Sequence, residues 1–112
     1  MIPIKRGEVY WIAFDRSVGG EIQKTRPAIV ISNDAANLTQ NRVQVVPISS
    51  KTLNVYPGEA LIELRGEKRK AIASQLGTAS KLRVGSKVGT LSKEDLCRVE
   101  DAVLLQLGMD RP

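Results

Sequence analysis

Two short segments of the sequence carry side chains that could act together on a phosphate group. In one, Arg26 stands before Pro27, which holds the preceding residue extended and can occupy the first position of a strand. In the other, Ser49 follows the apolar run 45–48 and is expected at a strand end. If these ends adjoin, the Arg26 guanidinium can grip phosphate oxygens while the Ser49 hydroxyl donates a hydrogen bond. The plainer interpretation is a surface ion-pair arginine and a turn serine.

Composition excludes several other kinds of site. The chain has no histidine and one cysteine, Cys97, so neither a Cys/His zinc cage nor an intrachain disulfide can form. Hydrolases often use imidazole because its pKa lies near neutrality, so catalysis here must depend on carboxylates, arginine or a hydroxyl. The single thiol favours a reducing cytoplasm, and residues 1–6 become charged before any signal peptide or membrane span appears. We expect a cytoplasmic protein without metal, cofactor or membrane association.

The size and charge of the chain suggest one small nucleic-acid-binding domain. Its 112 residues, with 42% hydrophobic and 26% charged side chains, fit a single globular domain over 1–112. The net charge is +5, and residues 65–91 alone carry 7 basic side chains against 1 acidic one. Such a surplus attracts polyanions, and nucleic acid is the first candidate. The alternative is a solvated hairpin with a few surface lysines.

The hydrophobic pattern predicts a β-rich fold. Alternating or β-branched runs predict strands at 7–15, 27–32, 42–49, 59–64, 71–75 and 88–91. Residues 65–68 and 81–87 are expected to be connections. Residues 16–25 are polar and rich in glycine, which predicts a long loop of the kind that often carries function.

One helix is predicted at the C-terminal end. Ser92 is a suitable N-cap, acidic residues follow in the first turn, and Gly108 suits the left-handed residue after the last turn. An apolar stripe at helical spacing should pack on the sheet; its members are Leu96, Val99, Val103, Leu104 and Leu107. Cys97 is expected to be semi-buried beside it. The predicted fold is α+β: a small, curled antiparallel β-barrel with a C-terminal helix on the sheet.

Several blocks in register then resemble one known family. They are 6–11 (RGEVYW), 19–21 (GGE) leading into 25–34 (TRPAIVISND), 46–50 (VPISS), 55–57 (VYP), 73–76 (ASQL), 81–83 (KLR) and 89–92 (GTLS). In this order and spacing they resemble the MazF/PemK toxins of type II toxin-antitoxin systems. The resemblance covers nearly the whole chain and implies the SH3-like barrel shared by MazF and CcdB.

The resemblance also implies an activity and its residues. Members of the family are sequence-specific, metal-independent endoribonucleases that cleave single-stranded RNA, including mRNA. By position, Arg26 corresponds to the catalytic arginine, Ser49 to the catalytic hydroxyl that is often threonine, and Glu21 to a glutamate in the preceding loop. The expected RNA-binding residues are Gly20, Lys24, Thr25, Ser50, Lys51, Tyr56, Gln75, Lys81 and Arg83. Arg16, Ser74 and Gly77 depart from common family residues, so the base preference cannot be transferred.

The implied partners are a second copy of the chain, RNA and an antitoxin. The family forms homodimers and is neutralised by MazE-like antitoxins with disordered, acidic tails. Two other functions stay open. A related CcdB-like barrel inhibits gyrase and cleaves nothing, and a small RNA-binding barrel would bind oligonucleotides and leave them intact.

Overall fold

The computed structural model describes residues 3–14 and 25–110. Its elements, in chain order, are β1 (Glu8–Ala13), β2 (Thr25–Val30), α1 (Asp34–Thr39), β3 (Arg42–Ser49), β4 (Glu59–Leu64), β5 (Glu67–Ile72), η1 (Ala73–Gln75), β6 (Gly77–Ser80), η2 (Lys81–Arg83), β7 (Val84–Thr90) and α2 (Lys93–Gln106). Neither of the α-helices in this part of the chain is long and apolar enough to cross a membrane.

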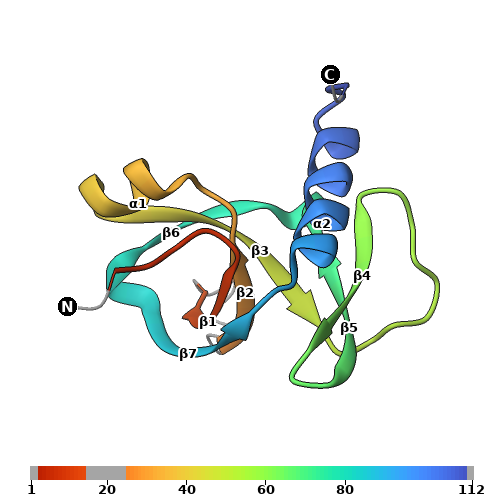
Figure 1. The fold of residues 1–112 in the computed structure, drawn as a ribbon, viewed down its shortest axis with the longest axis horizontal. Coiled ribbons are helices and arrows are strands. Elements are labelled where there is room, and N and C mark those ends of the chain that lie inside the picture. Colours follow the sequence, from red (N-terminus) through yellow and green to blue (C-terminus); the bar gives the residue numbers. More distant parts are fainter. Residues whose placement is uncertain (1–2, 15–24, 111–112) are drawn as a thin grey trace, which may run out of the picture.

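The strands form one curled antiparallel sheet. Hydrogen-bonded neighbours run in the order β4-β5-β3-β2-β1-β7, and β6 pairs with the first half of β3. The register of β1 against β7 shifts twice between Val9 and Ile12, and irregularities of this kind increase the twist of a strand. Figure 1 shows the resulting curl, with α2 beside β4 and α1 on the far side from the β4–β5 hairpin. The predicted curled antiparallel fold with a C-terminal helix on the sheet is confirmed.

Each face of the sheet has its own apolar cluster, because successive side chains of a strand point to opposite faces. The cluster under α2 combines helix residues Val99 and Ala102 with sheet residues that include Val9, Ile29, Val46 and Ile48. The cluster on the face away from α2 contains Tyr10, Ile12, Ala28, Val30, Val43, Val45 and Ala79. Neighbours along β1, β2 and β3 therefore alternate between the two clusters.

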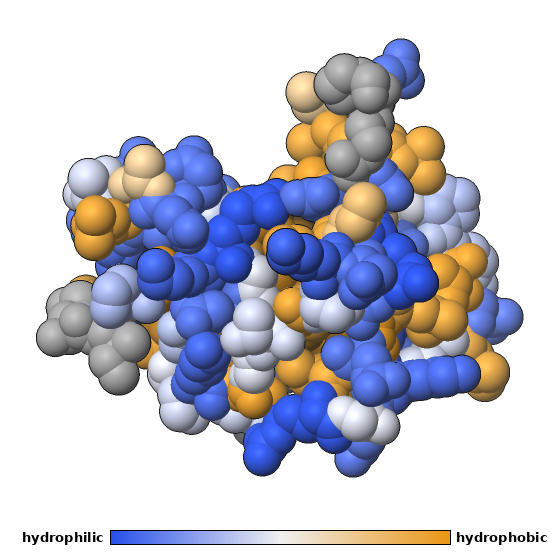
Figure 2. Space-filling view, in the orientation of Figure 1, coloured by the Kyte–Doolittle hydropathy of each residue, from blue (hydrophilic) through white to orange (hydrophobic). Residues whose placement is uncertain are grey.

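Helix α2 has the predicted ends but a shorter buried stripe. The Ser92 hydroxyl accepts the Asp95 N–H at 3.1 Å, and Gly108 has a φ of +71°. The prediction was wrong for Leu107, which is 55% exposed because the C-terminal end of the helix extends past the sheet. Figure 2 shows apolar surface gathered there. It was also wrong for Cys97, which is exposed.

Two elements were not predicted, and three strands begin earlier than predicted; one of these is β2, which begins at Thr25, the last residue of the predicted loop 16–25. The elements that were not predicted are α1, whose N-cap Asn33 accepts the Ala36 N–H at 2.8 Å, and β6. Strand β5 begins at Glu67 because only Arg65 and Gly66 form the turn of the β4–β5 hairpin, both at positive φ. Strand β7 begins at Val84, inside the predicted connection, because it pairs with β1. The predicted strand end at 73–75 is the 3-10 helix η1.

Candidate active site

The pairing of β2 with β3 directs the Arg26 end of β2 toward the Ser49 end of β3. Ala28 lies opposite Pro47, and the same register continues to Val30 opposite Val45. Ala28 and Pro47 are the last paired residues on this side, and the same register continued by two residues would bring Arg26 opposite Ser49. Both side chains then belong to the face of Ala28 and Val45, which is the face away from α2.

Two sets of paired residues, one in β5 and β3 and the other in β2, β1 and β7, form a row at this end of the sheet. Lys70 of β5 is opposite Ser49, and Ile12 of β1 is opposite both Arg26 and Val84 of β7. Residues directly opposite each other share a face, so the row faces away from α2, where Ile12 lies in its apolar cluster. Sequence reasoning did not place Lys70 in the site, because only the β3–β5 pairing brings it beside Ser49.

Within the described residues, few hydrogen bonds or ion pairs occupy the polar groups of Arg26 and Ser49. Ser49 Oγ accepts the Lys51 N–H at 3.1 Å, which leaves the hydroxyl proton available to donate. Within residues 3–14 and 25–110, no carboxylate forms a salt bridge with the half-buried Arg26. The ion-pair interpretation of Arg26 therefore finds no support in this part of the chain, and Ser49 is the last residue of β3 and not a turn residue.

Arg83 lies at the same end of the sheet as Arg26. Its Nη1 donates to the Ala13 carbonyl at 3.3 Å, and Ala13 is opposite Thr25, the residue before Arg26. Two guanidinium groups and the exposed Thr25 therefore lie near one set of strand ends.

Lys81 lies at the opposite end of β3. Its Nζ donates to the Asn37 carbonyl of α1, and its backbone N–H donates to Asn41 at 2.9 Å, just before β3 begins. Ser49 lies seven residue steps along β3 from Arg42, a span of roughly 23 Å at about 3.3 Å per residue. Lys81 therefore lies far from Ser49 along β3, although it is only two positions before Arg83 in η2.

The remaining predicted RNA-binding residues divide into three groups. Ser50 and Lys51 follow Ser49 directly and are exposed. Tyr56 is 60% exposed, as predicted, and lies near Gln75, because the neighbouring Ser74 N–H donates to the Gly58 carbonyl at 3.1 Å. Gly20, Lys24 and the catalytic candidate Glu21 lie outside the described residues.

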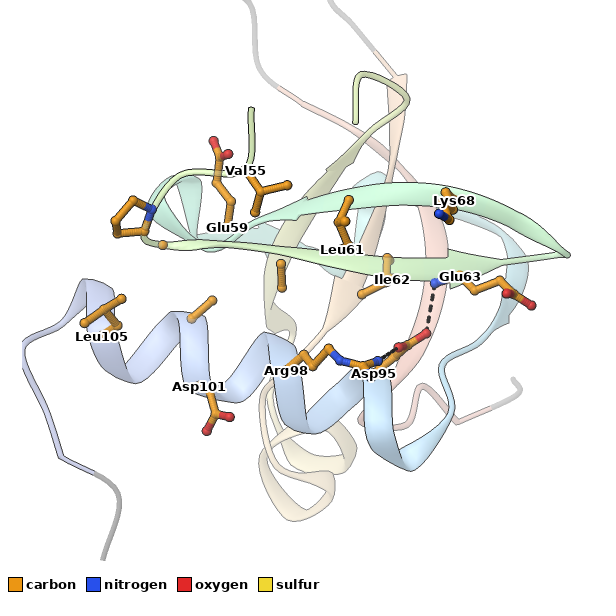
Figure 3. Close-up of a pocket in the computed structure, with 14 residues that line it drawn as sticks. Val55, Glu59, Leu61, Ile62, Glu63, Lys68, Asp95, Arg98, Asp101 and Leu105 are labelled. Carbon is orange, nitrogen blue, oxygen red and sulfur yellow. Dashed lines mark hydrogen bonds and ion pairs between the residues drawn. The ribbon is translucent and has the colours of Figure 1, made fainter. Parts of the chain in front are cut away.

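A groove of about 680 Å³ lies elsewhere, between β4 and α2 (Figure 3). Its apolar lining includes Val55, Leu61 and Leu105, and an Asp95–Arg98 ion pair lies at one end. None of the predicted catalytic or RNA-binding residues that the structure describes lines it. The chemistry expected from the sequence therefore belongs to the strand ends and not to this groove.

Fewer of the basic side chains of residues 65–91 are available to bind nucleic acid than the sequence suggests. Arg69 pairs with Glu67 at 2.6 Å, Lys70 with Glu59 at 3.2 Å, and Lys87 with Glu8 at 2.7 Å. The basic side chains also spread from the β4–β5 hairpin to the opposite edge strand β7, because β5 and β7 lie on different sides of the sheet path.

Among the described residues, no group of three or more acidic or cysteine side chains is arranged to hold a metal ion.

Comparison with known proteins identifies the family. A family model described as the PemK-like, MazF-like toxin of type II toxin-antitoxin systems matches residues 5–107. The chain belongs to this family, which confirms the expected resemblance. It is 31% identical over 115 residues to endoribonuclease MazF9 of Mycobacterium tuberculosis, covering 95% of this chain and 98% of that protein.

Solved structures share the fold at lower sequence identity. The crystal structure of MazF from Deinococcus radiodurans superposes with a TM-score of 0.82 at 23% identity, covering 97% of this chain and 100% of the other. An endoribonuclease from a mycobacterial species, solved in complex with its cognate antitoxin, has a TM-score of 0.79 at 21% identity, covering 97% and 99%. These structures support the fold assignment.

Proposed function

We propose that this chain is a sequence-specific endoribonuclease toxin that acts in the cytoplasm on single-stranded RNA, including mRNA, and arrests growth until an antitoxin neutralises it. Family membership and the relative named endoribonuclease MazF9 support this function. The observation that supports it is the β2–β3 pairing, in which Ala28 lies opposite Pro47, two residues from Arg26 and from Ser49 respectively.

The proposed reaction requires no metal, because the RNA supplies its own nucleophile. The ribose 2′-hydroxyl attacks the adjacent phosphorus and the 5′-oxygen leaves, which gives a 2′,3′-cyclic phosphate and a 5′-hydroxyl end. The protein aligns the phosphate and stabilises the charge on the five-coordinate phosphorus. A guanidinium stays protonated at neutral pH, so we assign Arg26 a charge-stabilising role and Ser49 a donated hydrogen bond. Glu21 would act as the base or would orient Arg26.

The RNA path proposed here follows the strand ends. Thr25 and Arg83 lie on one side of Arg26, and Ser50 and Lys51 follow Ser49. Tyr56 offers an exposed aromatic face for stacking an unpaired base, and Gln75 can read a base edge near it. Gly20 and Lys24 would contribute from the preceding loop. Lys81 would meet only RNA that reaches the far end of β3.

The proposed partners follow the family. A relative of this fold is named as a complex with its cognate antitoxin. We infer that a MazE-like antitoxin places a disordered, acidic tail across the strand ends of a homodimer and competes with RNA. A titration of the RNA complex with antitoxin tests this. Complete release of RNA at saturation is expected, and retained RNA would contradict direct competition.

The decisive experiment incubates the purified protein with a long RNA in EDTA. Discrete fragments with cyclic phosphate ends are expected, and sequencing of the fragment ends gives the cleavage motif. The Arg26→Ala variant should leave the RNA intact. Intact RNA with inhibited gyrase would favour a CcdB-like inhibitor, and intact RNA with salt-dependent binding would favour a non-catalytic RNA-binding barrel. Either result would overturn the proposed function.

A further inference from the structure

The segment 50–58, which connects β3 to β4, forms few hydrogen bonds between its own residues. It leaves the sheet at Ser49 and carries exposed side chains, among them Leu53 at 83% exposure, while Asn54 adopts a positive φ of 57°. It includes no helix or strand. Loops of this kind are ordered mainly by contacts from neighbouring elements, so the groups that reach it from the sheet determine its position.

Two side chains of the β4–β5 hairpin reach this segment together. Lys70 Nζ lies 3.2 Å from Glu59 Oε1 and 3.5 Å from the Leu53 carbonyl oxygen. Glu59 Oε1 also accepts the Tyr56 N–H at 3.0 Å. The ion pair therefore contacts the backbone at two points of the segment, three residues apart.

The Lys70–Glu59 pair is more enclosed than a surface ion pair. Their side chains are 10% and 14% exposed, compared with 30% and 66% for Arg69 and Glu67 on the same hairpin. The hydrogen bond from the Tyr56 N–H, together with the neighbouring Lys70, holds the pKa of Glu59 below its ordinary value of 4.5. Glu59 is therefore charged at neutral pH and accepts from both groups.

The pair lies next to the proposed catalytic hydroxyl. Lys70 is opposite Ser49 in the β3–β5 register, and the two share the face away from α2. Leu53 is four residues after Ser49, and between them Lys51 donates its N–H to Ser49 Oγ. A displacement of the segment at Leu53 would be transmitted to this hydrogen bond and to the Ser49 hydroxyl.

We propose that the Lys70–Glu59 ion pair is a positioning device for RNA: it fixes segment 50–58, and with it Ser50, Lys51 and Tyr56, beside the Ser49 end of β3. This inference rests on the proposed endoribonuclease function. Neither side chain need touch the reacting atoms. Their role is to hold the RNA-contacting residues in place before RNA binds, which lowers the ordering cost of binding.

The test compares variants of this pair with a matched ion pair on the same hairpin. Lys70→Met removes the cation, and Glu67→Gln removes the exposed Arg69–Glu67 pair as the control. Because Lys70→Met leaves Glu59 without its partner, the double variant Lys70→Met with Glu59→Gln provides a second form in which no unpaired carboxylate remains. Lys70→Arg keeps the charge and serves as the rescue.

The first readout is amide hydrogen exchange, which does not depend on activity. In both Lys70→Met variants, exchange within 51–58 should be about tenfold faster than in wild type and in Glu67→Gln, with the strand amides unchanged. Unchanged exchange in this segment would overturn the inference.

The second readout is cleavage of a single-stranded RNA oligonucleotide that contains the mapped motif. KM should rise about tenfold in both Lys70→Met variants, while kcat falls less and Lys70→Arg stays within about threefold of wild type. A purely structural role would lower the amount of active protein and leave KM unchanged. A KM within about twofold of wild type would therefore overturn only this inference. A wild-type protein that leaves RNA intact would overturn the proposed function and this inference with it.

Discussion

Asp95, in the first turn of α2, accepts the backbone N–H of Glu63 in β4, with 2.8 Å between the amide nitrogen and Oδ2. Glu63 belongs to a strand at one end of the sheet order. The other carboxylate oxygen of Asp95 pairs with Arg98, one turn further along the helix. One buried side chain therefore joins the helix to the edge of the sheet, at the groove drawn in Figure 3.

This bond predicts a large effect of Asp95→Ala on stability. The substitution leaves the Glu63 amide without its acceptor and removes the Arg98 ion pair, so the free energy of unfolding should fall by about 2 kcal/mol. Urea unfolding measures the change. Glu94→Ala, an exposed acidic residue in the same turn, is the control and should change stability by less than about 0.5 kcal/mol. Equal effects of the two substitutions would contradict the assigned role of Asp95.

Arg26→Ala should nearly abolish cleavage without unfolding the protein. Loss of one group that stabilises developing charge typically lowers the rate by about 10²–10³-fold. Arg26→Lys should recover little of the cleavage activity, because an ammonium cannot reproduce the bidentate hydrogen bonding of a guanidinium. Single-turnover cleavage measures the effect, and Arg42→Ala, an exposed arginine at the start of β3, should cleave normally. Wild-type cleavage by Arg26→Ala would show that the assignment is wrong.

At Ser49, threonine and alanine should behave differently. Ser49→Thr keeps an oxygen that accepts the Lys51 N–H and can donate to phosphate, so activity should remain within about threefold. Ser49→Ala loses both hydrogen bonds, and kcat should fall about 10²-fold. Ser86→Ala, in exposed β7, controls for the loss of a hydroxyl. The assignment fails if Ser49→Ala cleaves as fast as Ser86→Ala.

The lowered pKa of Glu8 predicts that the folded protein loses stability in acid. Burial raises the pKa of Glu8, but hydrogen bonds from Lys87, the Lys5 amide and the Tyr10 hydroxyl outweigh burial, so its pKa lies below 4.5 in the folded protein. The stabilisation is therefore present above the pKa of the unfolded chain and is lost as pH falls through the folded value. Urea midpoints from neutral pH down to about pH 3 should fall more steeply in wild type than in Glu8→Gln. Parallel curves would contradict this.

The raised pKa of Tyr10 predicts that the folded protein also loses stability at alkaline pH. Burial, with the hydrogen bond to Glu8, raises the pKa of Tyr10 from 10.0 to about 12. The neutral phenol is favoured in the folded protein, so its stabilisation is complete below the unfolded pKa and is lost as pH rises through the folded one. Wild type should lose more stability than Tyr10→Phe between these values, by urea unfolding at matched pH. An identical loss would mean that Tyr10 ionises equally in both states.

The sequence predicted best the bounds of elements that are determined by neighbouring residues in the chain. Strands β3 and β4 begin and end where their hydrophobic patterns predict, and α2 begins after the Ser92 cap. Helix α1 was missed because it has only six residues and depends on tertiary contacts, among them the hydrogen bond that Lys81 Nζ donates to the Asn37 carbonyl. Strand β6 was missed because its small residues have weak strand preference and are ordered by pairing with β3.

The candidate site was predictable by residue type but not by arrangement. Arg26 and Ser49 stand out in the sequence because prolines and strand ends surround them. Their alignment depends on the β2–β3 register, and the place of Lys70 on the β3–β5 register, which pair segments far apart in the chain. The interaction of Lys81 with α1 could not be predicted, because that helix was not recognised.

The row from Lys70 through Ser49, Arg26 and Ile12 to Val84 can form only after all of its strands have been synthesised. Its members come from five strands, and the last to be synthesised starts at Val84. Such long-range pairing forms late compared with helices and hairpins. A ribosome making this protein would therefore not be exposed to its activity until β7 has been synthesised.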